Sequence, residues 1–484
     1  MREEDDEVYF NDPEFLEYLQ KYEQARKDGE PIYMDAEELT DIAEFYMTHN
    51  RESEANEAIS LALSLHPNSV DPLIFLARQQ MFHDNLDKAI EIANAIPDQQ
   101  DKETIFLWME LLIRSDKPDE ALRLIENKLE EIEDDKETFL YDAATIFIDY
   151  QYNEMAEQLI RTLEEKYPQN NKLWKLKSEN LIENEEYDKA IEILQKHIDD
   201  HPYNFVAWER LAEAHAYKDE HQEALDCIEY CLAINPNYKL ALLQKSQSLT
   251  RLNHMDKAHQ IYIELLKKEP KNGRLLYMDA ITQANMENFE KARIQINNAL
   301  KYTPEYDEDR IHFLVNKAFI EGKCHNVEEA SNALNEARRL SKNHEEIEYD
   351  LFMGEIYLEN GMEKEAAEHF EIAYNESKNK QQTLLTMGIA YAETMHYQTA
   401  LSLLESYEQE YKGQEGVIAI PYLAYCYKSI HDQENYLKYL RKAVSADREI
   451  TEYLFAKDYP SIQPEEYYLY AFKNAYGRFP ESWE

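Results

Sequence analysis

Five prolines recur at a fixed period through the middle of the chain, and this period constrains the fold more than any other feature. Each lies 34 residues after the one before, and the set is Pro168, Pro202, Pro236, Pro270 and Pro304. An alanine stands twelve places before each closing proline, at positions 190, 224, 258 and 292. A self-similar period of this length is typical of stacked supersecondary units, none of which buries its apolar face alone. The period therefore predicts a repeat array.

One repeat, residues 171–202, has the pattern of two helices joined by a turn. Apolar and small residues follow helical spacing on both sides of the turn, and they are Trp174, Ser178, Leu181, Ala190, Ile191, Leu194 and Ile198. The small side chain of Ala190 suits the place where two helices cross closely. The closing proline cannot continue the second helix, yet it suits the start of a connection. Each repeat is therefore predicted to be a helical hairpin.

This hairpin pattern resembles the tetratricopeptide repeat (TPR), whose signature is a set of aromatic, Leu and small positions that ends in Ala and Pro. Matches in phase extend over roughly residues 36 to 446 and indicate about twelve units. Composition agrees with an all-α fold, because the chain has only nine glycines and is rich in good helix formers. The resemblance implies a right-handed α-solenoid of stacked helix-turn-helix TPR units, in which the first helices line a concave wall.

Departures from the period divide the chain into four predicted segments. They are an N-terminal capping helix with an acidic start (1–35), a TPR array of eight units (36–306), a second array of four units (311–449) and a tyrosine-rich C-terminal cap (450–484). The arrays separate after Pro304, where the spacing stretches and favours a bend. Caps are expected because each end of an array exposes an apolar face that needs cover. An aromatic recognition tail is the alternative interpretation of residues 450–484.

Two local signals refine the ends of the array. The N-terminal helix is expected to start at Asp12 and Pro13 and to stop at Gly29. In the last repeat Tyr436 stands where the other repeats have the crossing alanine. Packing is therefore expected to differ at that hairpin.

The chain is strongly acidic, with a formal net charge of −47. This charge argues against nucleic acid as a direct partner, because phosphate binding needs clustered Lys and Arg. We interpret the charge as a solvated surface that keeps a large helical array in solution. A surface that steers basic partners is the alternative.

The sequence shows no signal for a membrane or an oxidising compartment. No apolar run is long enough to span a bilayer, and the first residues lack the apolar stretch of a signal peptide, so no membrane insertion is expected. The cysteines follow no disulfide framework for a chain of this size, and they are Cys227, Cys231, Cys324 and Cys426. These features predict a cytoplasmic protein with reduced thiols.

No recognisable constellation for catalysis or cofactor binding occurs in the sequence. The nine glycines form no phosphate-binding loop, and neither HExxH nor the paired CxxC pattern of a zinc site is present. Cys227 and Cys231 lie four apart near His221, and we interpret them as core residues in preference to a metal site. We therefore expect no catalytic residue, no metal site and no cofactor, and we predict that the chain is not an enzyme.

The resemblance places the candidate binding site on the concave wall of first helices. Helical periodicity then selects the side chains that point away from the hairpin core. They are Tyr141, Thr145, Lys175, Glu179, Glu209, Arg210, Glu213, Gln244, Gln247, Arg274, Tyr277 and Asn316. This mixture of charges, amides and aromatic rings suits a peptide whose backbone amides need partners. The expected partner is another protein, bound as a peptide or helix that is neutral to basic.

Some members of the family hold an acidic peptide C-terminus with a clamp of Lys and Asn residues. Lys175 stands at one clamp position, but Glu179 stands where the clamp needs Asn, which disfavours acidic chaperone tails as ligands. The sequence favours a protein–protein interaction scaffold or adaptor. Two alternatives stay open: a TPR-type regulatory protein that acts on a signalling partner in a phosphatase-like way, and a structural subunit of a larger complex.

Overall fold

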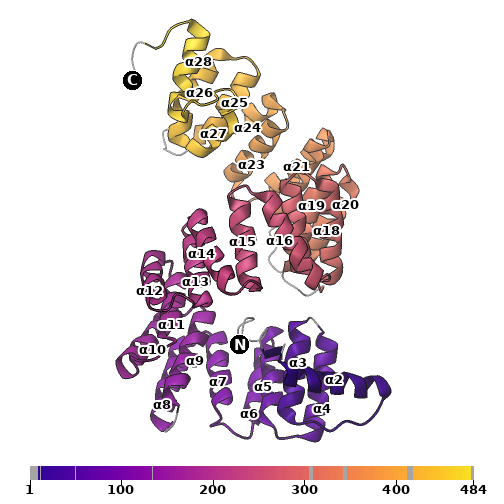
Figure 1. Cartoon of the computed structure of the whole chain (residues 1–484). Coiled ribbons are helices and arrows are strands. Elements are labelled where there is room, and N and C mark those ends of the chain that lie inside the picture. The colour runs from indigo at the N-terminus through magenta and orange to yellow at the C-terminus, as the bar shows by residue number, and fades with distance from the viewer. Residues whose placement is uncertain are drawn as a thin grey trace. The chain divides into compact units, whose positions relative to one another are not determined.

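The computed structural model of the chain describes residues 9–10, 12–49, 51–132, 135–304, 309–341, 346–410 and 418–480. These residues form helices and contain no strand, which confirms the predicted all-α fold (Figure 1). The chain forms two compact units, unit 1 with Met1–Asn253 and unit 2 with His254–Glu484. Each unit has its own hydrophobic clusters.

Unit 1 begins with helix α2 (Pro13–Asp28) and continues with alternating first and second helices of the repeats. The first helices are α3 (Ala36–Thr48), α5 (Val70–Phe82), α7 (Lys102–Arg114), α9 (Lys136–Asp149), α11 (Leu173–Glu183), α13 (Phe205–Tyr217) and α15 (Lys239–Arg251). The second helices are α4 (Glu52–Leu65), α6 (Leu86–Ala95), α8 (Pro118–Glu131), α10 (Asn153–Lys166), α12 (Tyr187–Asp200) and α14 (His221–Ile234). From α3 to α14, each second helix packs on the first helix before it and so completes a hairpin.

Unit 2 begins with α16 (Met255–Lys268), the second helix of the seventh repeat. First helices follow as α17 (Gly273–Asn285), α19 (Asp309–Lys323), α21 (Glu346–Glu359), α23 (Lys380–Glu393) and α25 (Ala419–Ser429). Their second helices are α18 (Phe289–Tyr302), α20 (Val327–Leu340), α22 (Glu363–Glu376), α24 (Tyr397–Glu410) and α26 (Gln433–Ala446). The unit ends with α27 (Arg448–Phe455), the 3₁₀ helix η1 (Pro464–Glu466) and α28 (Tyr467–Tyr476). Each of the predicted repeats therefore has its two helices.

Small side chains occupy the crossing position that the sequence predicted. The alanines there are fully buried, and in the hairpins that lie within one unit, from α4 to α24, they are Ala55, Ala89, Ala121, Ala156, Ala190, Ala224, Ala292, Ala330, Ala366 and Ala400. Glycine serves the same purpose on two first helices. A Cβ atom added to Gly354 would lie 2.4 Å from the ring of Phe370. The close approach of helices therefore depends on matched side-chain volumes across each hairpin.

The turns inside the second to the twelfth repeats share a backbone conformation that the sequence did not predict. One residue per turn is left-handed, with φ between 56° and 72°, and the set is Asp84, Asp116, Gln151, Glu185, Asp219, Asn253, Glu287, His325, Gly361, Met395 and His431. The following N–H reaches back to the end of the first helix, as from Glu186 to the Leu181 carbonyl at 2.8 Å. This arrangement ends the first helix with its carbonyls satisfied and reverses the chain.

Helix α2 begins and ends where the sequence predicted. The Asp12 side chain accepts the Glu14 N–H at 2.8 Å, and Gly29 ends the helix with φ 68°. The buried face of α2 carries Phe15, Leu19 and Tyr22, which share a cluster with residues of α3 and α4. The apolar face of α3 is therefore covered by a capping helix.

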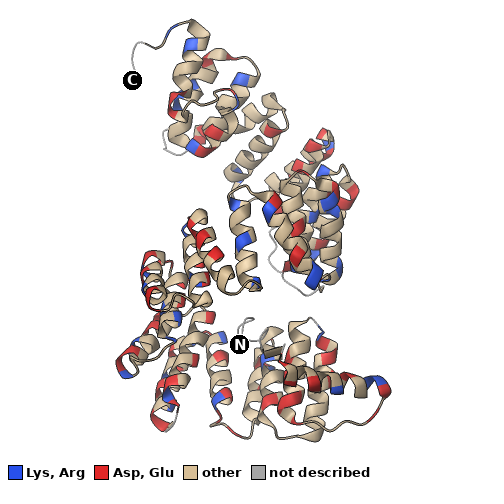
Figure 2. Ribbon diagram, viewed as in Figure 1, with Lys and Arg blue, Asp and Glu red and all other residues tan. Residues whose placement is uncertain are grey.

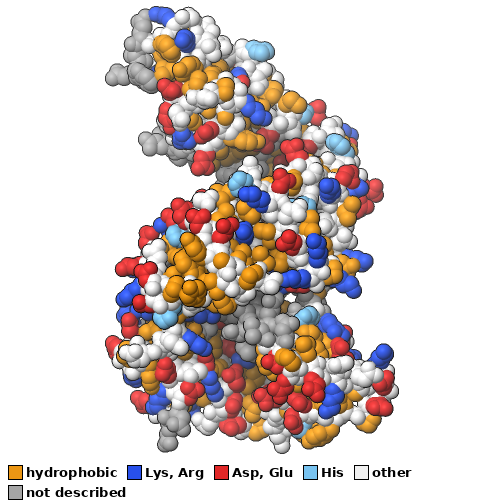
Figure 3. Space-filling view, viewed as in Figure 1, with side chains coloured by type: hydrophobic (Ala, Val, Ile, Leu, Met, Phe, Trp, Pro, Cys, Tyr) orange, Lys and Arg blue, Asp and Glu red, His pale blue; other side chains and the backbone are white. Residues whose placement is uncertain are grey.

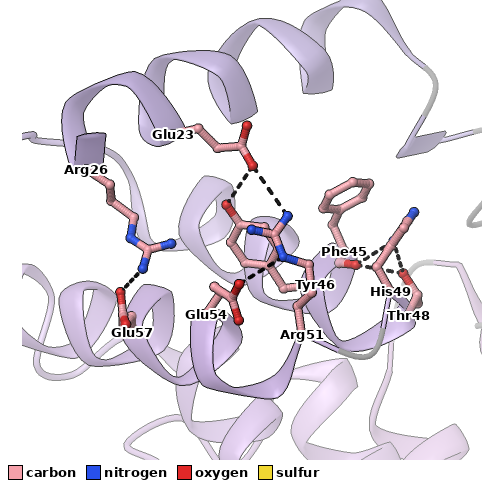
Figure 4. A network of polar contacts seen from close by, with 9 residues as sticks. All are labelled: Glu23, Arg26, Phe45, Tyr46, Thr48, His49, Arg51, Glu54 and Glu57. Atoms are coloured by element: carbon pink, nitrogen blue, oxygen red, sulfur yellow. Dashed lines mark hydrogen bonds and ion pairs between the residues drawn. The ribbon is translucent and has the colours of Figure 1, made fainter. Parts of the chain in front are cut away.

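Polar contacts fasten this cap to the first hairpin (Figure 4). The Tyr46 hydroxyl donates to Glu23 of α2 at 3.2 Å, and Arg51 contacts the same carboxylate at 3.5 Å. The Arg51 guanidinium also lies 4.3 Å from the centre of the Tyr46 ring. Arg26 of α2 pairs with Glu57 of α4. Figure 4 shows that these side chains point toward one another from three helices.

The C-terminal tyrosines pack mainly on the last hairpin. Tyr436, at the crossing position, shares a 2.8 Å hydrogen bond between its hydroxyl and that of Tyr459. Tyr459 and Tyr467 are buried, as is Phe455, whereas Tyr453 is exposed. The larger side chain at the crossing position therefore links the last hairpin to α27 and to the segment that follows it.

The predicted boundary between two arrays falls near residues 304–311, of which 305–308 lie outside the described residues. Helices α18 and α19 on either side pack together and share one hydrophobic cluster, with Ile296 from the first and Leu314 from the second. The division between compact units lies earlier, at Asn253 in the turn of the seventh repeat. The four predicted segments stay a prediction.

Candidate functional site

The first helices of unit 1 form a continuous wall. Each one packs on the next first helix, so that α9 contacts α11, α11 contacts α13 and α13 contacts α15. Among the described second helices of this unit, a comparable contact joins only α8 and α10. First helices therefore lie closer together than second helices, as on the inner side of a curved stack.

A pocket of about 330 Å³ opens on this wall between α9, α11 and α13. We call it the Arg210 pocket, and its lining residues are Ile148, Asp149, Gln151, Glu179, Ile182, Glu183, Arg210 and Glu213. Its volume lies near the lower end of the range for ligand pockets, roughly 300–1,000 Å³. The space therefore suits one or a few side chains of a ligand.

Arg210 lies among three carboxylates. Its Nη1 is 2.8 Å from Glu213, its Nη2 is 3.2 Å from Glu179 and its Nε is 3.6 Å from Glu209. The arginine side chain is 12% exposed, Glu179 is 5% exposed and Glu209 is fully buried. Burial by itself lowers the pKa of Arg210, but the carboxylates of Glu209, Glu213 and Glu179 outweigh it and raise that pKa. The guanidinium therefore stays charged and holds these acids on the wall.

The charge of the pocket lining is negative. Four of its residues carry carboxylates and only Arg210 carries a positive charge. Asp and Glu also predominate over Lys and Arg on the helices around the pocket (Figure 2). A partly enclosed site focuses such a field, because its walls have a lower dielectric constant than water. The pocket can therefore attract and hold a cationic group.

Two tyrosines lie beside the pocket. Tyr217 follows the lining residue Glu213 by one helical turn, and Tyr187 follows Glu183 across the short turn into α12. The two rings stack with centres 5.8 Å apart and planes inclined by 13°. Burial is the main cause that raises the pKa of Tyr217, and the negative charges of Glu213 and Glu183 raise it further. The aromatic pair is therefore electrostatically coupled to the acidic pocket.

Comparison with known proteins found partial matches. No family model matches the chain. Over 133 residues it is 26% identical to an Hsp70-Hsp90 organising protein of Plasmodium falciparum, which covers 26% of this chain and 52% of that protein. A match of the same length and identity is to an Hsp70-Hsp90 organising protein of the 3D7 isolate, of which 23% is covered. The chain thus spans about half the length of the first of these relatives.

Two solved structures illustrate the structural likeness. A tetratricopeptide repeat protein from Parabacteroides merdae has 17% identity and a TM-score of 0.41, with 50% of this chain and 93% of that chain covered. Yeast Tom70 has 15% identity and a TM-score of 0.39, with coverages of 85% and 98%. The decisive observation is in the chain itself, where hairpins repeat at 34 residues from Pro168 to Pro304 and a buried alanine recurs on the second helices from α4 to α24.

The chain is an array of helical hairpins that resembles the tetratricopeptide repeat.

Within this helical array, the pocket gathers only some of the predicted wall residues. Glu179, Arg210 and Glu213 line it together. Glu209 was predicted to face the groove, but it is fully buried because Arg210 covers it and the Gln244 amide donates to it from α15. Its carboxylate therefore acts inside the wall and has no direct access to a ligand.

The other predicted wall residues of unit 1 lie outside the pocket. Tyr141 and Thr145 are half-buried on α9, and the Thr145 hydroxyl donates to the Tyr141 carbonyl at 3.1 Å. Lys175 is half-buried on α11, and Gln247 is exposed on α15. Their part in binding stays a prediction.

The predicted residues of unit 2 form a separate group on α17 and α19. Arg274 is 64% exposed and pairs with Asp309 at 2.8 Å. The Tyr277 ring stacks on Phe313 at 4.1 Å, and its hydroxyl accepts the Asn316 amide at 3.0 Å. The structure thus brings Tyr277 and Asn316 together. A single binding wall from Tyr141 to Asn316 stays a prediction.

Sequence reasoning missed five lining residues, which are Ile148, Asp149, Gln151, Ile182 and Glu183. A signal for two of them was present, because Asp149 lies four residues after Thr145 and Glu183 lies four after Glu179. Residues four apart share one face of a helix. The site therefore continues the predicted face by one turn toward the hairpin ends.

The described residues contain no group of three or more His, Cys, Asp and Glu side chains placed to hold a metal ion. Cys227 and Cys231 are buried, and burial raises the pKa of Cys227 to about 12, so that this thiol is a poor metal ligand at neutral pH. In the same part of the chain, no helix is both long and apolar enough to cross a membrane.

Proposed function

We propose that this chain is a non-enzymatic interaction scaffold that binds a neutral to basic segment of another protein on the first helices of unit 1. One observation carries the proposal: the inner wall contains an acidic pocket of side-chain size, lined by four carboxylates and one guanidinium. The partner segment would lie along the wall and insert a basic side chain into the pocket. A cytoplasmic location stays part of the proposal.

The charge arrangement of the pocket supports a basic partner over an acidic one. Arg210 is already held by Glu213 and Glu179. A carboxylate ligand would have to displace these acids, whereas an ammonium or guanidinium group would meet a lining in which four carboxylates outnumber one guanidinium. Charge complementarity of this kind mainly sets association rate and register.

An interaction role also agrees with the names of the relatives. The protein of Plasmodium falciparum is named as an organiser of Hsp70 and Hsp90. A name of that kind supports an interaction role for this chain. The acidic lining of the Arg210 pocket favours a partner segment opposite in charge to the acidic tails that the sequence analysis disfavoured.

The test is charge reversal at the pocket, by changing Glu183 and Glu213 together to Arg. A partner is first captured with the parent chain, and its Kd is then measured for each variant by titration calorimetry. Exposed ion pairs contribute about 0–1 kcal/mol each, so we expect reversal at two sites to weaken binding by about tenfold or more.

The matched control changes Glu192 and Glu223 to Arg, because both are exposed on second helices and the net charge changes equally. The proposal requires that this control bind like the parent. Equal weakening of both double variants would show that only overall charge matters, and unchanged binding of the pocket variant would remove the pocket from the interface.

A further inference from the structure

The aromatic pair beside the Arg210 pocket adds a second kind of contact to its acidic lining. Tyr217 is 59% exposed, although it stacks on Tyr187. Hydrophobic side chains gather over α12 to α14 on the face shown in Figure 3. This large exposed ring, one helical turn after the lining acid Glu213, adds a flat aromatic surface beside the acidic pocket.

The basic side chains around the two tyrosines are themselves paired with carboxylates. Lys218 follows Tyr217 but is held at 2.8 Å by both Asp188 and Glu220. His215 lies 2.7 Å from Glu220 in the same group. Lys218 and His215 therefore have carboxylate partners of their own, and Glu183 and Glu213 are the pocket acids nearest in sequence to the two tyrosines.

The exposed aromatic ring and the acidic lining together favour arginine over lysine as the ligand side chain. A guanidinium is planar, is weakly hydrated, stacks on aromatic faces and donates several N–H bonds in one plane. An ammonium is compact and strongly hydrated and gains less from a stacked ring. Only an arginine side chain can lie flat on a tyrosine ring and donate in the same plane to an adjacent carboxylate.

We propose that the Arg210 pocket recognises an arginine side chain of the partner protein, stacked on the Tyr217–Tyr187 pair and hydrogen-bonded to Glu183 and Glu213. This inference rests on the proposed function and adds the identity of the anchoring side chain. The resident Arg210 shapes the floor of the pocket, and the incoming arginine occupies its rim.

The probes for the test are fluorescent Gly/Ser-based peptides that carry regularly spaced Arg, Lys or citrulline. Fluorescence anisotropy measures their Kd at low ionic strength, where exposed electrostatic contacts are least screened. We expect the Arg peptide to bind about two- to fivefold more tightly than the Lys peptide, as a cation–π contact at an exposed site allows. The citrulline peptide, which keeps the shape but not the charge, should bind most weakly.

Variants of the tyrosine test the stack itself. Tyr217→Ala should bind Arg and Lys peptides equally, whereas Tyr217→Phe should keep the preference because its ring remains. Circular dichroism checks that each variant is folded. A preference that survives in Tyr217→Ala would overturn the proposal, and so would its absence in the parent chain.

Acid variants separate this inference from the proposed function. Glu183→Gln with Glu213→Gln should weaken both basic peptides, and the control Glu192→Gln with Glu223→Gln should weaken neither. If the pocket variant weakens both peptides but the parent does not distinguish them, the arginine inference fails and the proposed function stands. If the pocket and control variants weaken binding equally, both fail.

Discussion

The first helices of unit 1 and unit 2 place different chemistry at the same positions of the repeat. Glu209 and Arg210 of α13 correspond, two periods later, to Tyr277 and Met278 of α17. In unit 1 these positions form a buried ion cluster that also holds Glu179. In unit 2 the wall is an aromatic stack with a hydrogen-bonded amide. The period thus determines where wall residues lie, and their side chains decide whether a wall is ionic or aromatic.

The largest effect should come from removing the cation of the unit 1 cluster. Arg210→Met leaves Glu179 and Glu209 buried without their main counter-charge, which typically costs about 3–5 kcal/mol of unfolding free energy. Urea denaturation followed by circular dichroism measures the loss, and hydrogen exchange should place it in α11 and α13. Arg274→Met in unit 2 is the control, because that side chain is exposed and its pair contributes about 0–1 kcal/mol. Equal losses would contradict the contrast between the two walls.

Asp350 in unit 2 gives the converse test, because here the buried charge is an acid held by basic side chains. Burial by itself raises the pKa of Asp350, but hydrogen bonds from His369 and Arg338, both at 2.7 Å, outweigh it and lower that pKa. The ionised Asp350 therefore stabilises unit 2 at pH values above the ordinary carboxyl pKa of about 3.9. This stabilisation is lost as the pH falls through the lowered pKa of Asp350. Asp350→Asn should cost about 1.5–3 kcal/mol at neutral pH and less in acid. A constant difference across an acid pH series of urea titrations would refute this.

The hairpin cores of the two units differ in how side-chain volume is divided between the first and the second helix. In unit 2 Gly354 faces Phe370, whereas in unit 1 the same two positions carry Ala212 and Ile228. Gly354→Ala should overpack its hairpin by about 1–3 kcal/mol. The double variant Gly354→Ala with Phe370→Ile recreates the unit 1 pair and should recover most of that loss. Additive losses in thermal denaturation would show that the two positions do not compensate each other.

The smallest expected effect is a gain in stability from a substitution in one of the turns. Unit 1 places Asp at several of its left-handed turn positions, and Asp tolerates this conformation, whereas unit 2 has Met395 with φ 67°. Met395→Gly should therefore raise the unfolding free energy by about 1 kcal/mol. Asp219→Gly, at φ 65° in unit 1, should gain less. A gain at position 219 equal to that at 395 would count against the explanation.

The sequence by itself determined the repeats, because their signals are local. A buried alanine, a closing proline and helical spacing act within a stretch of one hairpin, so each repeat from Ala36 to Ala446 has its helix pair as predicted. The N-terminal cap was predictable for the same reason, since Asp12 and Gly29 end a helix through contacts with neighbouring residues. The left-handed turns were not predicted, because residues as different as Glu185 and Met395 adopt them.

Only the tertiary structure decided which wall residues meet. Glu209 follows the periodicity of a groove residue, yet Arg210 and the Gln244 of the next repeat bury it. The pocket depends on the spacing between α9, α11 and α13, which joins Asp149 to Glu183 and Glu213 across separate repeats. Helical periodicity gives a direction around one axis, but a pocket requires the distance between axes, and that distance follows from packing along the whole stack.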